Sequence, residues 1–328
     1  MKFKDLMLDL ATGDASSNDP YIAEAAGQVN VATAYFEAAV QINELAEDND
    51  LQVVQEVAAA GLPTDETGSA ALGCTAVKKQ LEGFFKVVRE TADKVKKQAE
   101  KDMKVLLTIG KKYGVSAPSA SGNFATDFAE PLSKAVFQKA ENGKKISLPD
   151  LRFLKTRYAD DIVKGYVKGL CSIVFAYGFD ITEVFKDAVV SKEINQMFLK
   201  KGECKSLGCA AEALSDGAKF MKFGDVAKDK HYTDTIKPGD VKDLATNLYI
   251  IIAISSAVTD ALKGQDKNAS ANIAALVKDC NENDKKIAKP VKKIGENVKE
   301  WTSTVQETTN VITKAFTDSI YSLSEALK

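Results

Sequence analysis

Three sets of residues carry side chains that could do chemistry. Asp160 and Asp161 are adjacent acids of the kind that hold divalent metal ions in two-metal sites. Cys204 and Cys209 form the closest cysteine pair, although a zinc site would need two further thiolate or imidazole ligands. His231 is the only histidine, and its imidazole could act as a general acid or base. Each set needs partners that the fold would have to supply.

The two acids stand in the stretch Tyr158-Ala159-Asp160-Asp161. This stretch resembles the catalytic turn of reverse transcriptases, and the resemblance implies a pair of bound divalent metals. That family places the turn on a hairpin between strands, whereas these residues lie inside a long helical pattern. The other blocks of the family are not recognisable. We therefore predict two solvent-facing acids on a helix, following a buried tyrosine.

The cysteines are read as reduced thiols. Cys280 and His231 could complete a zinc site with Cys204 and Cys209 only if the fold brought all four together. We expect Cys204 and Cys209 near a turn between helices with one of them packed, and whether they pair or bind metal stays open. The five cysteines are scattered and odd in number, which favours a reducing compartment over a disulfide framework. They are Cys74, Cys171, Cys204, Cys209 and Cys280.

The remaining motifs favour no enzyme. Gly110-Lys111 and Gly143-Lys144 lack the rest of a phosphate-binding loop. Asn268-Ala269-Ser270 is a formal glycosylation triplet that we attribute to chance. The lysine-rich runs 96–104 and 278–293 contain interleaved acids, so we predict solvated helix faces rather than a phosphate surface. We therefore predict no catalytic residues, no metal or cofactor site and no small-molecule substrate.

The composition is that of a globular protein with little affinity for nucleic acid. The 328 residues are 45% hydrophobic and 27% charged, and the net charge is −2. Arg89, Arg152 and Arg157 are the only arginines among 44 basic residues, so the planar group that reads guanine or phosphate is scarce. The charged segment MKFKDLMLDLATGD lacks the apolar core of a secretory signal. We expect an intracellular protein that is not exported by the Sec route.

Helical patterns dominate the chain, with no strand-like alternation of useful length. We expect a first helix from about residue 18 to residue 47 and a linker at 60–69. The domains would be an N-terminal helical segment 1–60 and a bundle 70–328, or one continuous domain 1–328. Apolar residues recur every three or four positions over 77–109 and 291–327. Further predicted helices cover 147–177, 181–200, 210–223 and about 269–280, separated by loops at 114–123 and 224–240 and by Pro290.

Residues 244–259 form the longest uncharged stretch. As a helix, these 16 residues would span roughly 24 Å, less than the roughly 30 Å of a hydrocarbon core. We predict the central helix of a bundle, near 244–262, and not a constitutive membrane span. Insertion under some conditions and a partner-binding surface are the alternatives that we keep.

Together these patterns predict an all-α, elongated multi-helix bundle, in which long amphipathic helices pack around the central apolar helix. The expected function is that of a non-enzymatic structural or assembly protein that binds protein partners or itself. A component of a larger particle, such as a bacteriophage virion, is the setting that we favour. The alternative is the soluble form of an α-helical pore-forming protein.

Overall fold

The computed structural model describes residues 73–118, 123–141, 156–185, 204–223, 237–263, 269–278, 280 and 285–327. The chain divides into two compact units, Leu8–Ala70 and a second one made of Ala71–Lys328 with Met1–Met7. All described residues belong to the second unit. The expected first helix and the 60–69 linker lie outside the described residues, so the predicted domain boundaries stay a prediction.

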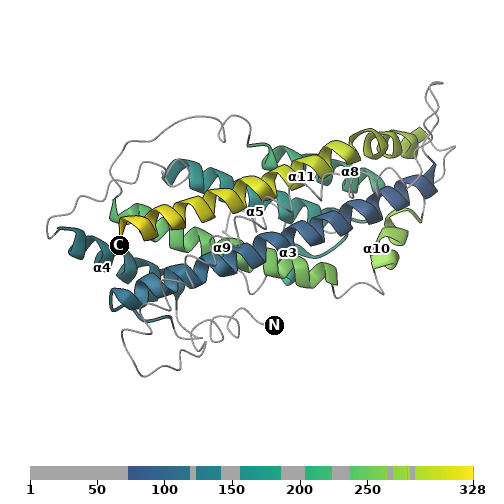
Figure 1. Ribbon diagram of the computed structural model, residues 1–328. Helices are drawn as coiled ribbons and strands as arrows, with labels where there is room; N and C mark the ends of the chain where they lie inside the picture. The colour runs from purple at the N-terminus through teal and green to yellow at the C-terminus, as the bar shows by residue number, and fades with distance from the viewer. Residues whose placement is uncertain are drawn as a thin grey trace. The chain divides into compact units, whose positions relative to one another are not determined.

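The described part is an all-α multi-helix bundle, as predicted, and none of its residues lies in a strand. Figure 1 shows its two longest helices, α3 and α11, side by side. Helix α3 runs over Cys74–Lys112 and α11 over Lys285–Ala326. At about 1.5 Å per residue they extend roughly 58 Å and 63 Å. The predicted apolar face of each is confirmed, since Leu81, Leu106, Ile294 and Ile320 are all fully buried.

Helices α3 and α11 run parallel and in register. Phe84 packs edge-to-face on Trp301, and the amide of Gln98 donates to Thr317 at 3.2 Å. At the far end, Lys112 and Tyr113 donate to the backbone carbonyl of Leu327, both at 3.4 Å. In each of these contacts the two residues are separated by a nearly constant number of positions in the sequence. The two helices must therefore run in the same direction.

The start of α11 differs from the sequence prediction. Pro290 was expected to interrupt the chain, but it lies inside the helix, in the second turn. Pro290 is the sixth residue of the helix and lies beyond the first N–H groups, which have no intrahelical partner, so it removes one i→i−4 hydrogen bond that the rest of α11 must compensate. Its ring lies close to α8, since a Cβ built on Gly208 would stand 3.7 Å from its Cγ.

Helix α9, Pro238–Lys263, begins earlier than predicted. The KPGD segment was expected to close a loop, yet Pro238 is the first helical residue. Proline suits this position because its fixed φ matches a helix and no N–H is needed there. The Asp240 carboxylate accepts from the backbone N–H of Lys237 at 2.8 Å, which is half of a capping box.

Helices α5, Thr156–Ala176, and α8, Leu207–Met221, form a close antiparallel pair. Gly165 and Gly169 of α5 face Phe220, Met221 and Gly217 of α8. A Cβ on Gly165 would stand 2.6 Å from the Phe220 carbonyl oxygen, so only glycine permits this approach. Helix α5 stops as predicted at Gly178, which has a φ of 87°.

Four shorter elements complete the described part. They are the π-helix η1 over Ala125–Ala129, α4 over Glu130–Glu141, α6 over Ile181–Val184 and α10 over Ala269–Leu276. Helices η1 and α4 were missed in the sequence analysis, although Phe124, Phe128, Leu132 and Val136 recur every four residues and are buried. The rest of the helix predicted over 181–200 lies outside the described residues.

Candidate functional site: the apolar helix α9 and its cover

Helix α9 is enclosed at its middle. All six residues from Ile251 to Ser256 are buried, and so are Leu244, Leu248 and Val258. The helix packs on α3, α5, α4 and η1. It runs antiparallel to α3, because Lys263 at its end pairs with Asp93 while Ile251 lies beside Asp102. The prediction of a buried apolar helix is therefore confirmed.

The cover of α9 differs in one respect from the prediction. The amphipathic stretch 291–327, now part of α11, was expected to close directly around the apolar helix. Instead α11 packs mainly on α3 and α8. It meets α9 around a small cavity beside Ile251, where Ile312 and Phe316 contribute to the lining. Helix α3 can face two partners because it buries residues over a wide arc.

The half of α9 nearer residue 238 is held by one aromatic contact to Phe124 and two polar contacts to α4. Tyr249 stacks on Phe124 with ring centroids 4.7 Å apart. The Ser133 hydroxyl donates to the Pro238 carbonyl at 2.6 Å, and Lys242 pairs with Glu130 at 3.3 Å. Glu130 is also paired with Lys134, and these two lysines lower the pKa of its carboxyl. Such exposed pairs fix orientation more than they add stability.

Polar groups are also buried against the middle of α9. The hydroxyls of Tyr166 on α5 and Ser255 on α9 lie 3.0 Å apart and form a hydrogen bond. Burial raises the pKa of Tyr166 far above its usual range, although the bond to Ser255 acts the other way. Thr259 is fully buried, and within the described part its hydroxyl has no hydrogen-bond partner. An unsatisfied buried hydroxyl costs free energy.

Asp102 is the most perturbed acid of the described part. It lies on the apolar face of α3 and is 2% exposed. Its carboxyl contacts the amide of Gln98 at 3.1 Å and the hydroxyl of Thr317 on α11, also at 3.1 Å. Burial raises its pKa to about 7, although the contacts with Gln98 and Thr317 and the charge of Lys101 lower it. The charge of Asp318 adds to the increase. Burial thus keeps a proton on Asp102 at pH values where an exposed aspartate is fully ionised.

The cavity between α3, α9 and α11 adjoins this carboxyl. Its lining consists of Val95, Gln98, Ala99, Asp102, Ile251, Ile312, Thr313 and Phe316. Its volume of ≈ 10 Å³ is about that needed by a single water molecule. It is far smaller than the several hundred Å³ of a typical ligand pocket, roughly 300–1,000 Å³. The buried carboxyl thus lies at a helix interface rather than in a substrate cleft.

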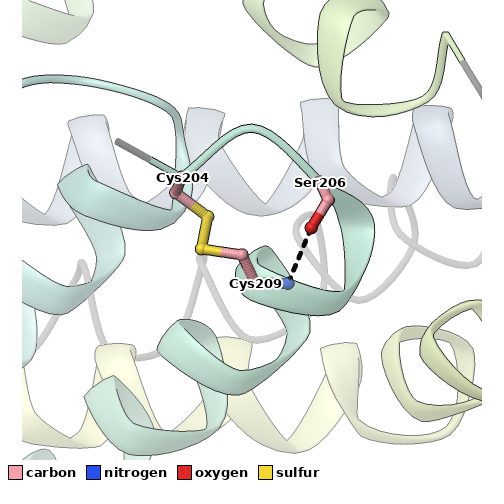
Figure 2. The surroundings of a disulfide bond; sticks show 3 residues. All are labelled: Cys204, Ser206 and Cys209. Carbon is pink, nitrogen blue, oxygen red and sulfur yellow. Dashed lines mark hydrogen bonds between the residues drawn. A yellow bond between two sulfur atoms is a disulfide. The ribbon is translucent and has the colours of Figure 1, made fainter. Parts of the chain in front are cut away.

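The expectation of reduced cysteines without a disulfide framework was wrong, whereas the prediction that one of Cys204 and Cys209 is packed near a helix start is confirmed. Cys74 and Cys280 form a disulfide, and Cys204 and Cys209 form a second one. Figure 2 shows the second, beside the Ser206 hydroxyl that caps α8 by accepting from the Cys209 N–H at 3.3 Å. Cys204 is buried. Cys171 is free and buried in α5, where desolvation raises the pKa of its thiol. The scattered spacing hid these pairs, because disulfide formation depends on distance in the fold.

Among the described residues, no three or more His, Cys, Asp or Glu side chains lie close enough together to hold a metal ion. The metal-site hypotheses therefore gain no support from this part of the chain. Tyr158, Asp160 and Asp161 lie on the α5 backbone, which is helical and not the hairpin of a polymerase turn. Gly110 lies in the last helical turn of α3, against Phe128. His231, Gly143-Lys144 and Asn268 fall outside the described residues.

The lysine-rich run 96–104 is solvated in part: Lys97, Lys101 and Lys104 are exposed, whereas the side chains of Lys96 and Glu100 are mostly buried. Lys97 pairs with Asp93 at 2.8 Å, and Lys96 lies 4.0 Å from Glu100. Desolvation would raise the pKa of Asp93, but the hydrogen bonds and charges of Lys97 and Lys263 lower it. In the described part of the run 278–293, Lys292 pairs with Glu296 just beyond it, at 3.6 Å.

By length and composition alone, α9 could cross a membrane; it is the one such helix in the described part of the chain. Of its most apolar stretch, 61% is buried inside the bundle. The core helix of a soluble protein meets the same test, so this property does not establish a membrane role. Comparison with known proteins gives no family for the chain: no family model, no curated protein and no solved structure matches it.

Proposed function

We propose that this chain is a non-enzymatic structural protein, whose helical bundle acts through its outer surface as a component of a larger assembly. The main observation that supports this proposal is the parallel packing of α3 on α11. Two helices of 39 and 42 residues lie in register, with contacts from Phe84–Trp301 to Lys112–Leu327. Helices packed along their length resist bending, because any bend must deform both closely packed surfaces. A strut of this kind suits a load-bearing or spacing role.

The outward face of α11 suits contacts with other proteins. Its exposed positions recur along the helix at Lys299, Ser303, Glu307, Asn310 and Lys314. They mix positive, negative and neutral side chains, which favours complementary protein surfaces over the polyanionic backbone of nucleic acid. Protein partners or further copies of the chain are therefore the partners that we propose. A bacteriophage particle is one setting that would need a helical component of this kind. Synthesis inside the cell, without export by the Sec route, is also part of the proposal.

Co-fractionation from the source material tests this function. The wild-type chain is expected at the mass of a large particle, by sedimentation followed by mass spectrometry. A Lys299→Glu, Lys314→Glu double variant should change the unfolding midpoint little, because the pair of Lys314 with Asp318 that it removes is exposed, and it should weaken incorporation. Lys219→Glu, an exposed change on α8, is the matched control. A chain found solely as a free monomer, for wild type and variants alike, would overturn the proposal.

A second function, membrane insertion through α9, is favoured by one observation. The helix contains 26 residues, or roughly 39 Å, and by length and composition it could cross a membrane, although its uncharged part, 244–259, stays shorter than a hydrocarbon core. Helices α3 and α5 would have to separate from it to expose Ile251–Ser256. Dye release from vesicles tests this. Leakage that is abolished by Ile251→Asp in a variant that remains folded would support insertion. No leakage by the wild type at any pH or lipid composition would remove this function.

A further inference from the structure

Both disulfides lie near the start of α11. Cys74 is the first residue of α3, and its partner Cys280 lies between α10 and α11. The Cys204–Cys209 disulfide joins the segment before α8 to the first turn of that helix. This turn approaches α11, since Gly208 lies beside Pro290. Covalent bonds thus hold the end of the bundle at which α11 begins.

The two ends of the parallel pair are closed by different chemistry. At the end where both helices begin, the Cys74–Cys280 bond joins residues 206 positions apart. At the opposite end, hydrogen bonds from Lys112 and Tyr113 to the Leu327 carbonyl do the joining. The first closure responds to thiol reagents, whereas the second does not. This asymmetry makes one end of the pair sensitive to redox conditions.

Within the described part of the chain, the element beside the Cys74–Cys280 bond is short and its main packing partner is α3. Helix α10 has eight residues and packs on α3. Ile273 and Leu276 are its buried apolar side chains within the described part. An isolated helix of this length is unstable in water, so its order depends on its attachment. Both cysteines are only partly buried, unlike Cys204 of the other disulfide.

The core of the bundle depends less on the Cys74–Cys280 bond than α10 does. Leu81, Met103 and Leu106 of α3 are fully buried among α9 and α11, well beyond the first turn. Trp301 and Ile312 of α11 are buried as well. These apolar contacts remain when two sulfur atoms separate. Loss of the bond should therefore loosen one end of the bundle before it affects the rest.

We propose that Cys74–Cys280 is a redox-controlled clasp, which is open as two thiols in a reducing compartment and closed as a disulfide in an oxidising one. Opening releases α10 and the first turn of α3 and of α11, while the enclosed part of α9 stays covered. The clasp goes beyond the proposed structural function and does not rest on it. It also reconciles intracellular synthesis with a disulfide-bonded form, because cytosolic thiols are kept reduced.

Closure follows ordinary thiol–disulfide exchange, with a small disulfide such as oxidised glutathione as the oxidant. One cysteine thiolate attacks the oxidant, forms a mixed disulfide and releases one glutathione thiolate. The second cysteine thiolate then attacks the protein sulfur of the mixed disulfide and releases the other. The protein loses two protons and two electrons, and one oxidised glutathione becomes two reduced ones. Reduction by excess glutathione reverses both steps.

The test equilibrates the full-length chain in glutathione buffers of different ratio. Free thiols are alkylated, and the modified cysteines are mapped by mass spectrometry together with backbone hydrogen exchange. Cys74 and Cys280 are expected to change together. In the reduced form, amides of residues 269–278 should exchange roughly tenfold faster or more, as expected for local opening. Amides of Leu248–Ser256 should stay protected over the same labelling period.

Two variants separate the clasp from the neighbouring disulfide. Cys280→Ser in oxidising buffer should reproduce the fast exchange of residues 269–278. Cys209→Ser, which opens the other disulfide, should leave exchange at those residues slow. If a variant fails to fold, wild-type buffers in which Cys74 and Cys280 are alkylated while Cys204 and Cys209 are not still decide the question. Equal exchange of residues 269–278 in both buffers would overturn the proposal, as would loss of all protection on reduction or alkylation of Cys74 in oxidising buffer.

Discussion

The buried carboxyl of Asp102 makes a stability prediction with a definite sign. Its pKa is raised from 3.8 to about 7 by burial between α3 and α11. Between those two pH values the folded chain keeps a proton that the unfolded chain releases. Stability contributed by the protonated carboxyl is therefore fully present below pH 3.8 and is lost as the pH rises through about 7.

The size of the effect follows from the same shift. The displacement of the pKa is roughly three units, and each unit corresponds to about 1.4 kcal/mol, so the total is about 4 kcal/mol. Asp102→Asn keeps the shape of the side chain and removes its charge. The variant should match the wild type near pH 4 and exceed its free energy of unfolding by about 4 kcal/mol at pH 8.

Urea unfolding at a series of pH values provides the assay. Trp301, the only tryptophan, is buried in the α3/α11 interface and reports on unfolding by fluorescence. Asp93→Asn is the control, because the pKa of Asp93 is lowered despite its desolvation. Asp93 stabilises the fold above its ordinary pKa and loses this effect as the pH falls, so the control should be destabilised at pH 8. An Asp102→Asn advantage that does not change between pH 4 and pH 8 would refute the reasoning.

Five further substitutions test packing and covalent closure. Gly165→Ala should lower the free energy of unfolding by about 1–3 kcal/mol, since its Cβ would collide with the Phe220 carbonyl. Gly83→Ala, which has open space, should raise it by about 0.5–1 kcal/mol, and a loss at Gly83 equal to that at Gly165 would contradict the packing argument. Thr259→Val should raise it by about 1 kcal/mol, because it removes a buried unpaired hydroxyl; calorimetry showing a loss would indicate a hidden partner. Opening the 206-residue loop by Cys280→Ser should cost about 5 kcal/mol in urea unfolding and opening the 5-residue loop by Cys209→Ser about 2 kcal/mol, whereas equal costs would exclude the loop-entropy explanation.

The sequence allowed the prediction of features that depend on nearby residues. Apolar spacing identified the buried faces over 77–109 and 291–327, because a helix with period 3.6 places such residues on one side. The lack of a polar face predicted that residues 244–259 are enclosed. Gly178 was identified as a helix stop because its conformation is decided within one turn.

Features that depend on distant residues were not predicted. The parallel direction of α3 and α11 is determined by how the intervening chain folds, and apolar spacing is the same in either direction. The pairing of Cys74 with Cys280 depends on that same direction. The burial of Asp102 did have a local signal, since it occupies the apolar register of α3, but its partner Thr317 lies 215 residues away. The contact of Gly165 and Gly169 with α8 likewise requires knowledge of which helix is adjacent.

The parallel register of α3 and α11 has a consequence for biosynthesis. The residues that cover α3 are made about 215 positions after it, as the pairs Asp102–Thr317 and Lys112–Leu327 show. At 5–20 residues per second, the apolar face of α3 waits roughly 10–40 s on the ribosome before its partner exists. Helix α9 emerges earlier than α11 and can cover part of that face in the meantime. The nascent chain therefore passes through a long interval in which a chaperone, or an early contact with α9, must keep Leu81 and Leu106 from aggregating.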